Sequence, residues 1–142
     1  MAPPLPTKIQ LHIVSAERSL VNETVDEVEI PGADGYFGVL PGHTPLLAVL
    51  GAGELWYRQG QEKHYFVIAF GFAEVQPDRV TILAQIAEYA HEIDLARAEA
   101  AKKRAEERLM RPQVDMDAER ARISLLKSLI RLQVATRAKI RS

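Results

Sequence analysis

The stretch VTILAQIAEYAHEIDLARA, residues 80–98, decides the fold, because the chain changes character within it. Val80–Gln85 has the composition of a short strand, whereas Asp94 is suited to cap the free backbone amides at the start of a helix. Beyond this point, residues 91–142 contain no Gly, one Pro and no aromatic residue. We therefore expect a β domain over residues 1–90 and an α-helical domain over residues 91–142.

Charge divides the chain at the same place. Residues 1–90 carry 5 basic and 11 acidic residues, whereas residues 91–142 carry 13 basic and 8 acidic residues. Seven basic residues and no acidic residue follow Glu119. This asymmetry favours an acidic protein partner for the helical part. Nucleic acid is a poorer candidate, because aromatic and Gly-rich contact elements are missing there and the isoelectric point is about 6.4.

Length and composition limit the class of protein. A chain of 142 residues has room for one core, or one core with a small satellite. The absence of Cys excludes a disulfide framework and thiol chemistry. Residues 1–6 lack the pattern of a signal or transit peptide, and no apolar run approaches the roughly 20 residues that span a bilayer. We expect a soluble protein that reaches a membrane only through its partners.

The first ninety residues have the period and punctuation of short strands. Lys8–Val14 alternates as a half-buried strand does, and Thr24–Ile30 has an acidic outer face. Further strands are predicted at Phe37–Leu40, Leu46–Leu50, Glu54–Arg58, His64–Phe70, Phe72–Gln76 and Val80–Gln85, with turns between them that include Gly51-Ala52-Gly53. Short strands at this spacing predict an antiparallel β-sandwich or flattened barrel.

The segment Gly35–Leu46 is the densest in turn signals. Pro41-Gly42 suits a tight turn, because Pro presets φ and Gly accepts a positive φ. One interpretation is a plain corner of the sandwich. The other is a shaped loop that presents Tyr36, Phe37 and His43 to a partner.

Nothing in the sequence predicts catalysis. The four His residues lack metal-ligand spacing, no Gly-Lys-Ser/Thr follows the glycines at 32, 35 and 38, and no Ser lies in a nucleophile elbow. We expect a protein that is not an enzyme and holds no metal.

The helical part is predicted to be a two-helix hairpin. The first helix begins at Asp94 and continues to about Met110, where Arg111-Pro112 ends it. Asp115 or Asp117 caps the second helix, which continues to about Lys139.

The second helix carries two apolar faces. Ala121, Leu125, Ser128, Leu132 and Ala135 share one face, and Ile123, Leu126, Ile130 and Val134 share the opposite face. A hairpin needs only one apolar face, so the other is predicted to meet a further surface. Arg120, Lys127 and Arg131 form a basic strip beside them.

Several motifs in their order resemble the ε subunit of the bacterial F-type ATP synthase along essentially the whole chain. They are Gly38-Val39-Leu40-Pro41-Gly42-His43-Thr44-Pro45-Leu46, Gly71-Phe72-Ala73-Glu74-Val75, Val80-Thr81-Ile82-Leu83-Ala84 and Ile93-Asp94-Leu95-Ala96-Arg97-Ala98. The resemblance implies a β-sandwich followed by a helical hairpin. It also implies a non-catalytic rotor subunit at the cytoplasmic face of the bacterial inner membrane, attached peripherally through its complex.

The resemblance implies partners for the sandwich. These are the γ subunit and the ring of c subunits, through which ion flow is coupled to rotation. The loop from Asp34 to His43 matches the region that faces the c-ring. Family members often carry an acidic residue at the position of Tyr36 and a Gly at the position of Phe70, so this chain departs from the family pattern at both.

The hairpin is implied to be regulatory. Extended into the catalytic head of α and β subunits it would block ATP hydrolysis, with Arg120, Arg122 and Lys127 meeting an acidic segment of β. No cofactor is implied to be required, but the folded hairpin of some members binds ATP. Carried over by motif, the candidate nucleotide residues are Glu88, Ile93, Asp94, Arg97, Ala98, Arg104, Lys127 and Arg131. Lys127 stands where strong binders have Arg.

Two alternatives remain open from the sequence. The hairpin could be a structural brace of the stalk that never inhibits. The chain could also be an unrelated β-sandwich adaptor whose basic hairpin binds an acidic protein or RNA.

Overall fold

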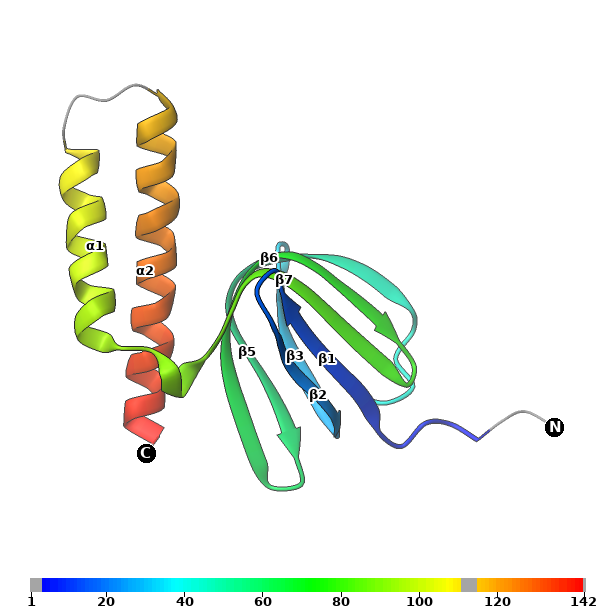
Figure 1. The fold of residues 1–142 in the computed structure, drawn as a ribbon. Coiled ribbons are helices and arrows are strands. Elements are labelled where there is room, and N and C mark those ends of the chain that lie inside the picture. The colour runs from blue at the N-terminus through cyan, green and yellow to red at the C-terminus, as the bar shows by residue number, and fades with distance from the viewer. Residues whose placement is uncertain (1–3, 111–114, 142) are drawn as a thin grey trace. The chain divides into compact units, whose positions relative to one another are not determined.

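The structure is a computed structural model, which describes residues 4–110 and 115–141, and the side chains of residues 4–110 and 118–136. The chain forms two compact units, residues 1–88 and residues 89–142. The first is built of strands and the second of helices (Figure 1).

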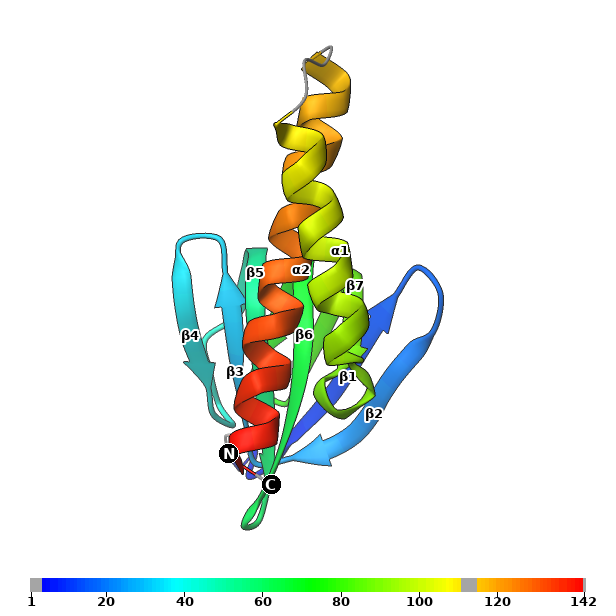
Figure 2. The same ribbon diagram turned by 90° about the vertical axis from the view of Figure 1, so that its left-hand side faces the viewer.

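The β unit contains a seven-stranded sheet with the order β2-β1-β7-β6-β5-β3-β4. The strands are β1 (Ile9–Ser15), β2 (Ser19–Val25), β3 (Glu27–Gly32), β4 (Gly35–Val39), β5 (Leu46–Gln59), β6 (Glu62–Gln76) and β7 (Arg79–Tyr89). The hairpin of β3 and β4 lies at one side of this unit and β2 at the other (Figure 2).

The sheet folds over into two layers. Three strands separate β2 from β5 in the sheet order, yet the side-chain amide of Gln59 on β5 donates to the carbonyl oxygen of Thr24 on β2 at 3.1 Å. The backbone N–H of Asp26 also donates to the carbonyl oxygen of Arg58 at 2.8 Å. Because β2, at one end of the sheet, meets β5 in this way, the predicted β-sandwich or flattened barrel is confirmed. One pairing differs from the antiparallel prediction, since β1 lies parallel to β7.

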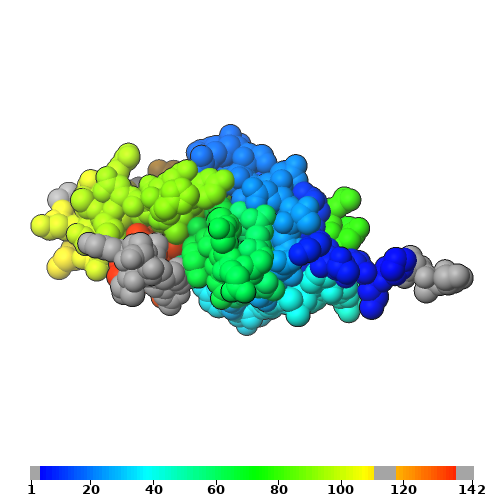
Figure 3. Space-filling model, turned by 90° about the horizontal axis from the view of Figure 1, so that it is seen from below, coloured from blue at the N-terminus to red at the C-terminus, as the bar shows by residue number. Residues whose placement is uncertain are grey.

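Ion pairs join neighbouring strands around Asp26, the residue between β2 and β3. The carboxylate of Asp26 pairs with Lys8 and accepts the backbone N–H of Gly60 at 2.6 Å, while Nε of Arg58 lies 2.8 Å from a carboxylate oxygen of Glu27. The hydrogen bond from Lys8, helped by that from Gly60, lowers the pKa of Asp26, and the hydrogen bond to Glu27 raises the pKa of Arg58. Figure 3 shows the turn between β5 and β6 in green against the blue end of β2.

The core of the β unit consists of large apolar side chains. Those of highest volume that are fully buried include Phe66, Ile9, Leu11, Ile13, Ile30, Leu55, Ile68 and Ile82. Burying each such side chain contributes about 1.5–3 kcal/mol before the entropy cost of ordering it. The predicted alternation of Lys8–Val14 is confirmed, because Ile9, Leu11 and Ile13 are its buried members.

Two long strands replace four predicted short ones. The predicted turn at Gly51-Ala52-Gly53 is wrong, because β5 continues through it, and β6 likewise joins the segments on either side of Phe70-Gly71. Phe70 has φ of 60° and Gly71 has φ of 125°, so the backbone of β6 departs from regular strand geometry there. Phe66 and Ile68 are buried before this point, but Phe72 is exposed after it. Val67 and Ala69 are buried before this point, and Ala73 and Val75 after it, so one face of β6 stays buried along the strand while the other becomes exposed beyond Phe70.

A bend at Asp26 divides another predicted strand. The prediction joined Thr24–Ile30, whereas the structure ends β2 at Val25 and begins β3 at Glu27. The Asp26 carboxylate is satisfied by Lys8 and Gly60, which stabilises the bend. The stretch Ser19–Glu23 was missed because its polar residues hide the alternation that marks a strand.

The helical unit comprises a short 3-10 helix, η1 (Ala90–Glu92), and two α-helices, α1 (Leu95–Leu109) and α2 (Asp115–Arg141). The predicted cap is confirmed, because a carboxylate oxygen of Asp94 accepts the backbone N–H of Arg97 at 3.1 Å. The helices α1 and α2 lie side by side as an antiparallel hairpin (Figures 1 and 2). The predicted break at Arg111-Pro112 and the cap at Asp115 or Asp117 lie outside the described residues and side chains.

The seam between α1 and α2 is made of small side chains. Ala98 and Ala105 are the buried residues of α1. On α2, Ala121, Ser128 and Ala135 are buried, and they belong to the predicted first apolar face. Of the second face, Ile130 and Val134 are buried while Ile123 and Leu126 are exposed. α2 also contacts η1.

Candidate functional site

An exposed apolar row crosses three neighbouring strands of the β unit. It consists of Leu47 and Val49 on β5, Phe72 on β6 and Leu83 on β7, and each is at least half exposed. Val49 and Phe72 are direct cross-strand partners. We call these four residues the outer row. Exposed apolar side chains that adjoin in this way are typical of a surface that a partner covers.

The residues predicted to present a loop to a partner differ in their exposure and in their contacts. Tyr36 on β4 is 55% exposed, and its hydroxyl oxygen accepts the backbone N–H of Glu54 at 3.1 Å. This contact ties the edge strand β4 to β5. Phe37 is half-buried opposite Ile30, and Nδ1 of the half-buried His43 donates to the carbonyl oxygen of Thr44 at 2.6 Å.

Gly53 explains how Tyr36 fits. A Cβ at Gly53 would lie 2.1 Å from the Tyr36 hydroxyl oxygen, so only Gly leaves room for the ring. The ring is thus fixed at one end by its hydroxyl while its exposed part faces outward.

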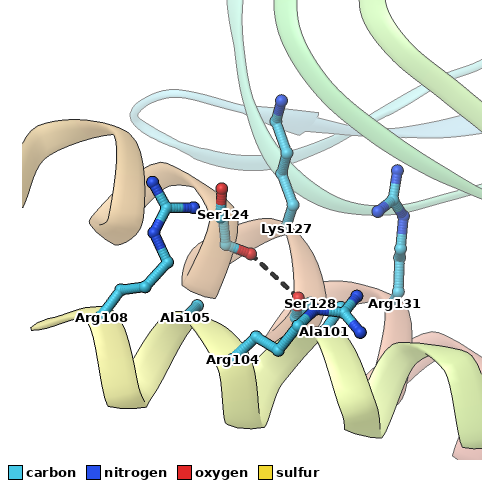
Figure 4. A pocket seen from close by; sticks show the side chains of 8 residues that line it. All are labelled: Ala101, Arg104, Ala105, Arg108, Ser124, Lys127, Ser128 and Arg131. Carbon is cyan, nitrogen blue, oxygen red and sulfur yellow. Dashed lines mark hydrogen bonds between the residues drawn. The ribbon is translucent and has the colours of Figure 1, made fainter. Parts of the chain in front are cut away.

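A basic pocket lies in the hairpin. It has a volume of about 250 Å³ and is lined by Ala101, Arg104, Ala105, Arg108, Ser124, Lys127, Ser128 and Arg131. Arg108 of α1 extends to the same side as Lys127 and Arg131 of α2, while Arg104 follows the seam toward Ser128 (Figure 4). The Ser128 hydroxyl donates to the carbonyl oxygen of Ser124 at 2.9 Å. Four cations thus line a pocket whose floor is made of small side chains, which is an arrangement suited to an anion.

The structure brings together three of the eight residues expected to bind a nucleotide. Arg104, Lys127 and Arg131 line the pocket. Ile93, Asp94, Arg97 and Ala98 are not among its lining residues, and an oxygen of Asp94 is used by the helix cap. Glu88 belongs to the β unit.

Sequence reasoning missed the other pocket residues. Arg108 lies four residues after Arg104, so both are on one helix face, and this spacing was available in the sequence. Ser124 and Ser128 gave no comparable signal, because polar residues on an apolar helix face are common. Only the pairing of α1 with α2 places them beside the cations.

The remaining basic residues of the expected interface are exposed. Arg120 and Arg122 are on the outside of α2, and Nη1 of Arg122 lies 3.3 Å from a carboxylate oxygen of Glu119. Ile123, Leu126 and Leu129 are exposed apolar residues of the same helix. α2 therefore presents apolar and basic side chains together.

Within the part of the chain that the structure describes, no cluster of His, Asp or Glu is arranged to hold a metal ion. In residues 4–110 and 115–141, no helix has both the length and the apolar character to cross a bilayer.

Comparison with known families accounts for both units. Residues 8–90 match the β-sandwich domain of the ATP synthase delta/epsilon chain, and residues 91–136 match the long α-helix domain of the same family. The chain belongs to the ATP synthase delta/epsilon family. It is 49% identical to the ATP synthase epsilon chain of Syntrophobacter fumaroxidans, over 90% of this chain and 96% of that one. It is 42% identical to the epsilon chain of Solibacter usitatus, over 92% and 98% of the two chains.

Chains of solved ATP synthase structures have the same fold. A chain of the Euglena gracilis mitochondrial ATP synthase, in the assembly of OSCP, F1 and c-ring, matches 97% of this chain with a TM-score of 0.81 and 26% identity. The match covers 84% of that chain. A chain of the Tetrahymena thermophila ATP synthase central stalk and c-ring shares the fold with a TM-score of 0.63 at 15% identity, over 95% and 98% of the two chains. The resemblance expected from the motifs is therefore confirmed at the level of family and fold.

Proposed function

We propose that this chain is a non-catalytic subunit of the central stalk of an F-type ATP synthase, where it couples ion translocation to rotation. The observation that carries the proposal is the match of both units, in order, to the two domains of the delta/epsilon family. The Euglena relative lies in an assembly with F1 and the c-ring, which supports the γ subunit and the c-ring as partners. The chain would then be peripheral to the cytoplasmic face of the membrane.

The outer row is our candidate for the surface that docks on γ. Leu47, Val49, Phe72 and Leu83 leave apolar area in water that a rotor subunit would bury against its neighbour. Tyr36 and the segment that follows it lie on β4 and the loop after it, which the family resemblance assigns to the c-ring. Phe72→Glu should weaken capture by γ at least about tenfold, because it places a charge in an apolar contact. Lys63→Glu on the same strand, outside the outer row, is the control.

We further propose that the hairpin is a brake on ATP hydrolysis. Two properties support this: its seam consists of small side chains, which makes opening inexpensive, and α2 presents Ile123, Leu126 and Leu129 beside the exposed Arg120 and Arg122. Such a helix suits an acidic, partly apolar surface in the catalytic head.

The test compares ATP hydrolysis by the reconstituted synthase carrying the full chain with that of a truncation after Tyr89. A rise in hydrolysis with intact coupling supports the brake. Unchanged hydrolysis would show a structural brace. Failure of the full chain to join the complex would reject the stalk assignment and favour an unrelated adaptor.

Regulatory ATP binding is a separate proposal for the hairpin. It is supported by the convergence of Arg104, Lys127 and Arg131 on one pocket. Calorimetry on the full chain should show saturation by millimolar ATP, and a flat titration would contradict the proposal.

A further inference from the structure

We propose that Phe70 is a positioning residue for the outer row, because its left-handed backbone fixes the direction of Phe72. Phe70 is half-buried within β6 and has φ of 60°. It lies two residues before Phe72, the member of the outer row on the same strand. This inference rests on the proposed role of the outer row as a docking surface, and it names a residue that orders that surface before the partner binds.

The first argument is the backbone of β6. Phe70 and Gly71 both have positive φ, 60° and 125°, which is not the geometry of a regular strand. The flanking pairs Leu50–Gly71 and Ala52–Ala69 nevertheless keep one register with β5, and one residue separates the two pairs on each strand. The irregularity therefore comes from the backbone angles of two residues and not from a slip between the strands.

The second argument is the place of this irregularity along the strand. Phe66 and Ile68 precede Phe70 at alternate positions and are buried. Phe72 and Glu74 follow it at alternate positions and are exposed. The exposed part of β6 thus begins directly after the two residues with positive φ. Because their backbone angles are the last ones before Phe72, they set the direction in which its side chain leaves the sheet.

The third argument is that close contacts hold the backbone at this position. A Cβ at Gly71 would lie 2.0 Å from the carbonyl oxygen of Leu83 on β7, which is itself a member of the outer row. Gly51 stands opposite Phe70 in the register of β5 with β6, and a Cβ there would lie 2.9 Å from the carbonyl oxygen of Gly32 on β3. A strained backbone angle persists only where its surroundings fix it, and these contacts supply that constraint.

A narrow range of φ at Phe70 suits a docking surface. At positive φ a residue with a side chain has only a small allowed region, whereas Gly has a broad one. With Phe at this position, Phe72 is held in one direction, so a partner meets an apolar surface that is already ordered. Rigidity of this kind raises affinity because less conformational freedom is lost on binding. Phe70 therefore costs strain in the free chain and strengthens the complex.

The experiment measures the binding of the full chain to immobilised γ subunit of the same synthase, together with the thermal unfolding of each variant. Phe70→Gly removes the strain but widens the range of φ, so it should weaken binding about two- to fivefold. Phe70→Ala keeps both the strain and the narrow range, so its affinity should stay within about twofold of the original. The less stable of the two variants should therefore bind more tightly, an order that a merely structural role does not produce.

Two further variants complete the test. Phe70→Asn keeps a Cβ but tolerates the left-handed backbone, so it should be more stable than Phe70→Ala and bind as tightly. This variant decides the question if Phe70→Ala does not fold. Lys63→Gly is the matched control, because it places a Gly in the same strand at an exposed position outside the outer row. It should lower the thermal midpoint and leave binding to γ unchanged.

Other results would overturn the inference. If affinity follows the thermal midpoint, so that Phe70→Gly binds at least as tightly as Phe70→Ala and Phe70→Asn, then Phe70 has a structural role only. If the Ala and Asn variants lose as much affinity as Phe72→Glu, the ring of Phe70 contacts the partner itself and does not act through Phe72. If Phe72→Glu leaves binding unchanged, the proposed docking surface is wrong and this inference fails with it, while the stalk assignment is still decided by the hydrolysis assay.

Discussion

The core of the β unit and the seam of the hairpin bury different kinds of side chain. The core buries Phe66, Leu55 and a set of Ile residues, whereas the seam buries Ala98, Ala105, Ala121, Ser128 and Ala135. Burial free energy scales with apolar area, so each seam residue contributes little compared with about 1.5–3 kcal/mol for a large core side chain. The comparison teaches that the packing of α1 on α2 contributes less burial free energy per residue than the packing of the β core. Four predictions test this contrast, from the largest effect to the smallest.

Gly71→Ala should destabilise the β unit the most. A Cβ at Gly71 would lie 2.0 Å from the carbonyl oxygen of Leu83, and φ is 125°. Backbone of β6 or β7 must move, so we expect a loss of about 3 kcal/mol or more in the free energy of unfolding, measured by urea denaturation.

Gly35→Ala is the matched control for crowding. Its φ of 131° is similar, but nothing lies within 4 Å of the added Cβ. It should cost only the conformational strain, on the order of 1–3 kcal/mol. Equal losses for the two variants would show that the close approach of β6 to β7 is unimportant.

Ala98→Leu should open the hairpin and leave the β unit intact. Ala98 is buried in the seam and does not line the pocket, and overpacking a well-packed contact typically costs about 1–3 kcal/mol. Hydrogen exchange should accelerate in α1 and α2 but not in the β strands. Ala100→Leu, at an exposed position of α1, should have little effect. Faster exchange in the strands as well would show that the two units are not independent.

Substitutions of Phe70 should change stability less, and Gly should be more stable than Ala at this position. Because its φ is 60°, a Gly at this position relieves strain that an Ala does not. Phe70→Gly should therefore be more stable than Phe70→Ala by about 1 kcal/mol, although Gly is normally the weaker residue in a strand. Thermal unfolding of the two variants measures the difference. An Ala variant that equals or exceeds the Gly variant would contradict a left-handed backbone at this position.

Asp26→Asn should have the smallest effect, confined to the β unit. The pKa of Asp26 is lowered by Lys8 and Gly60, so the folded state prefers the charged form. Its contribution to stability is therefore present above the pKa of the unfolded state, near 3.9, and is lost as pH falls through the lower pKa of the folded state. Asp26→Asn should reduce stability at pH 7 and flatten the loss between pH 5 and 2. A parallel acid profile for both proteins would show that the charge of Asp26 does not stabilise the β unit.

Glycines limited what could be predicted of the strands. Glycines such as Gly51, Gly53 and Gly71 are typical of turns, and a turn was predicted at Gly51-Ala52-Gly53. The structure uses Gly53 to make room for Tyr36 and Gly71 to let β7 approach. Both roles depend on a neighbour distant in sequence, which local composition does not contain.

The hairpin pocket, like the strands, could be predicted only in part from the sequence. The basic residues Arg104, Lys127 and Arg131 were predicted from the family resemblance, and they line one pocket. Arg108, Ser124 and Ser128 join them only because α1 and α2 pair in one register. A helix face is visible in a sequence, but the face opposite it across a seam is not.

Periodicity, capping and charge are local properties, and for that reason the sequence by itself determined much of this protein. It indicated the β half and the helical hairpin, the cap at Asp94, the apolar face that forms the seam, and the family. Tertiary structure alone decided the parallel pairing of β1 with β7, the continuity of β5 and β6 through their glycines, and the closing of the sheet by Asp26 and Arg58. It also decided the composition of the pocket. These features arise from contacts between segments that are distant in the sequence. The energies of such contacts depend on how the whole chain packs, so no periodic pattern in the sequence indicates them.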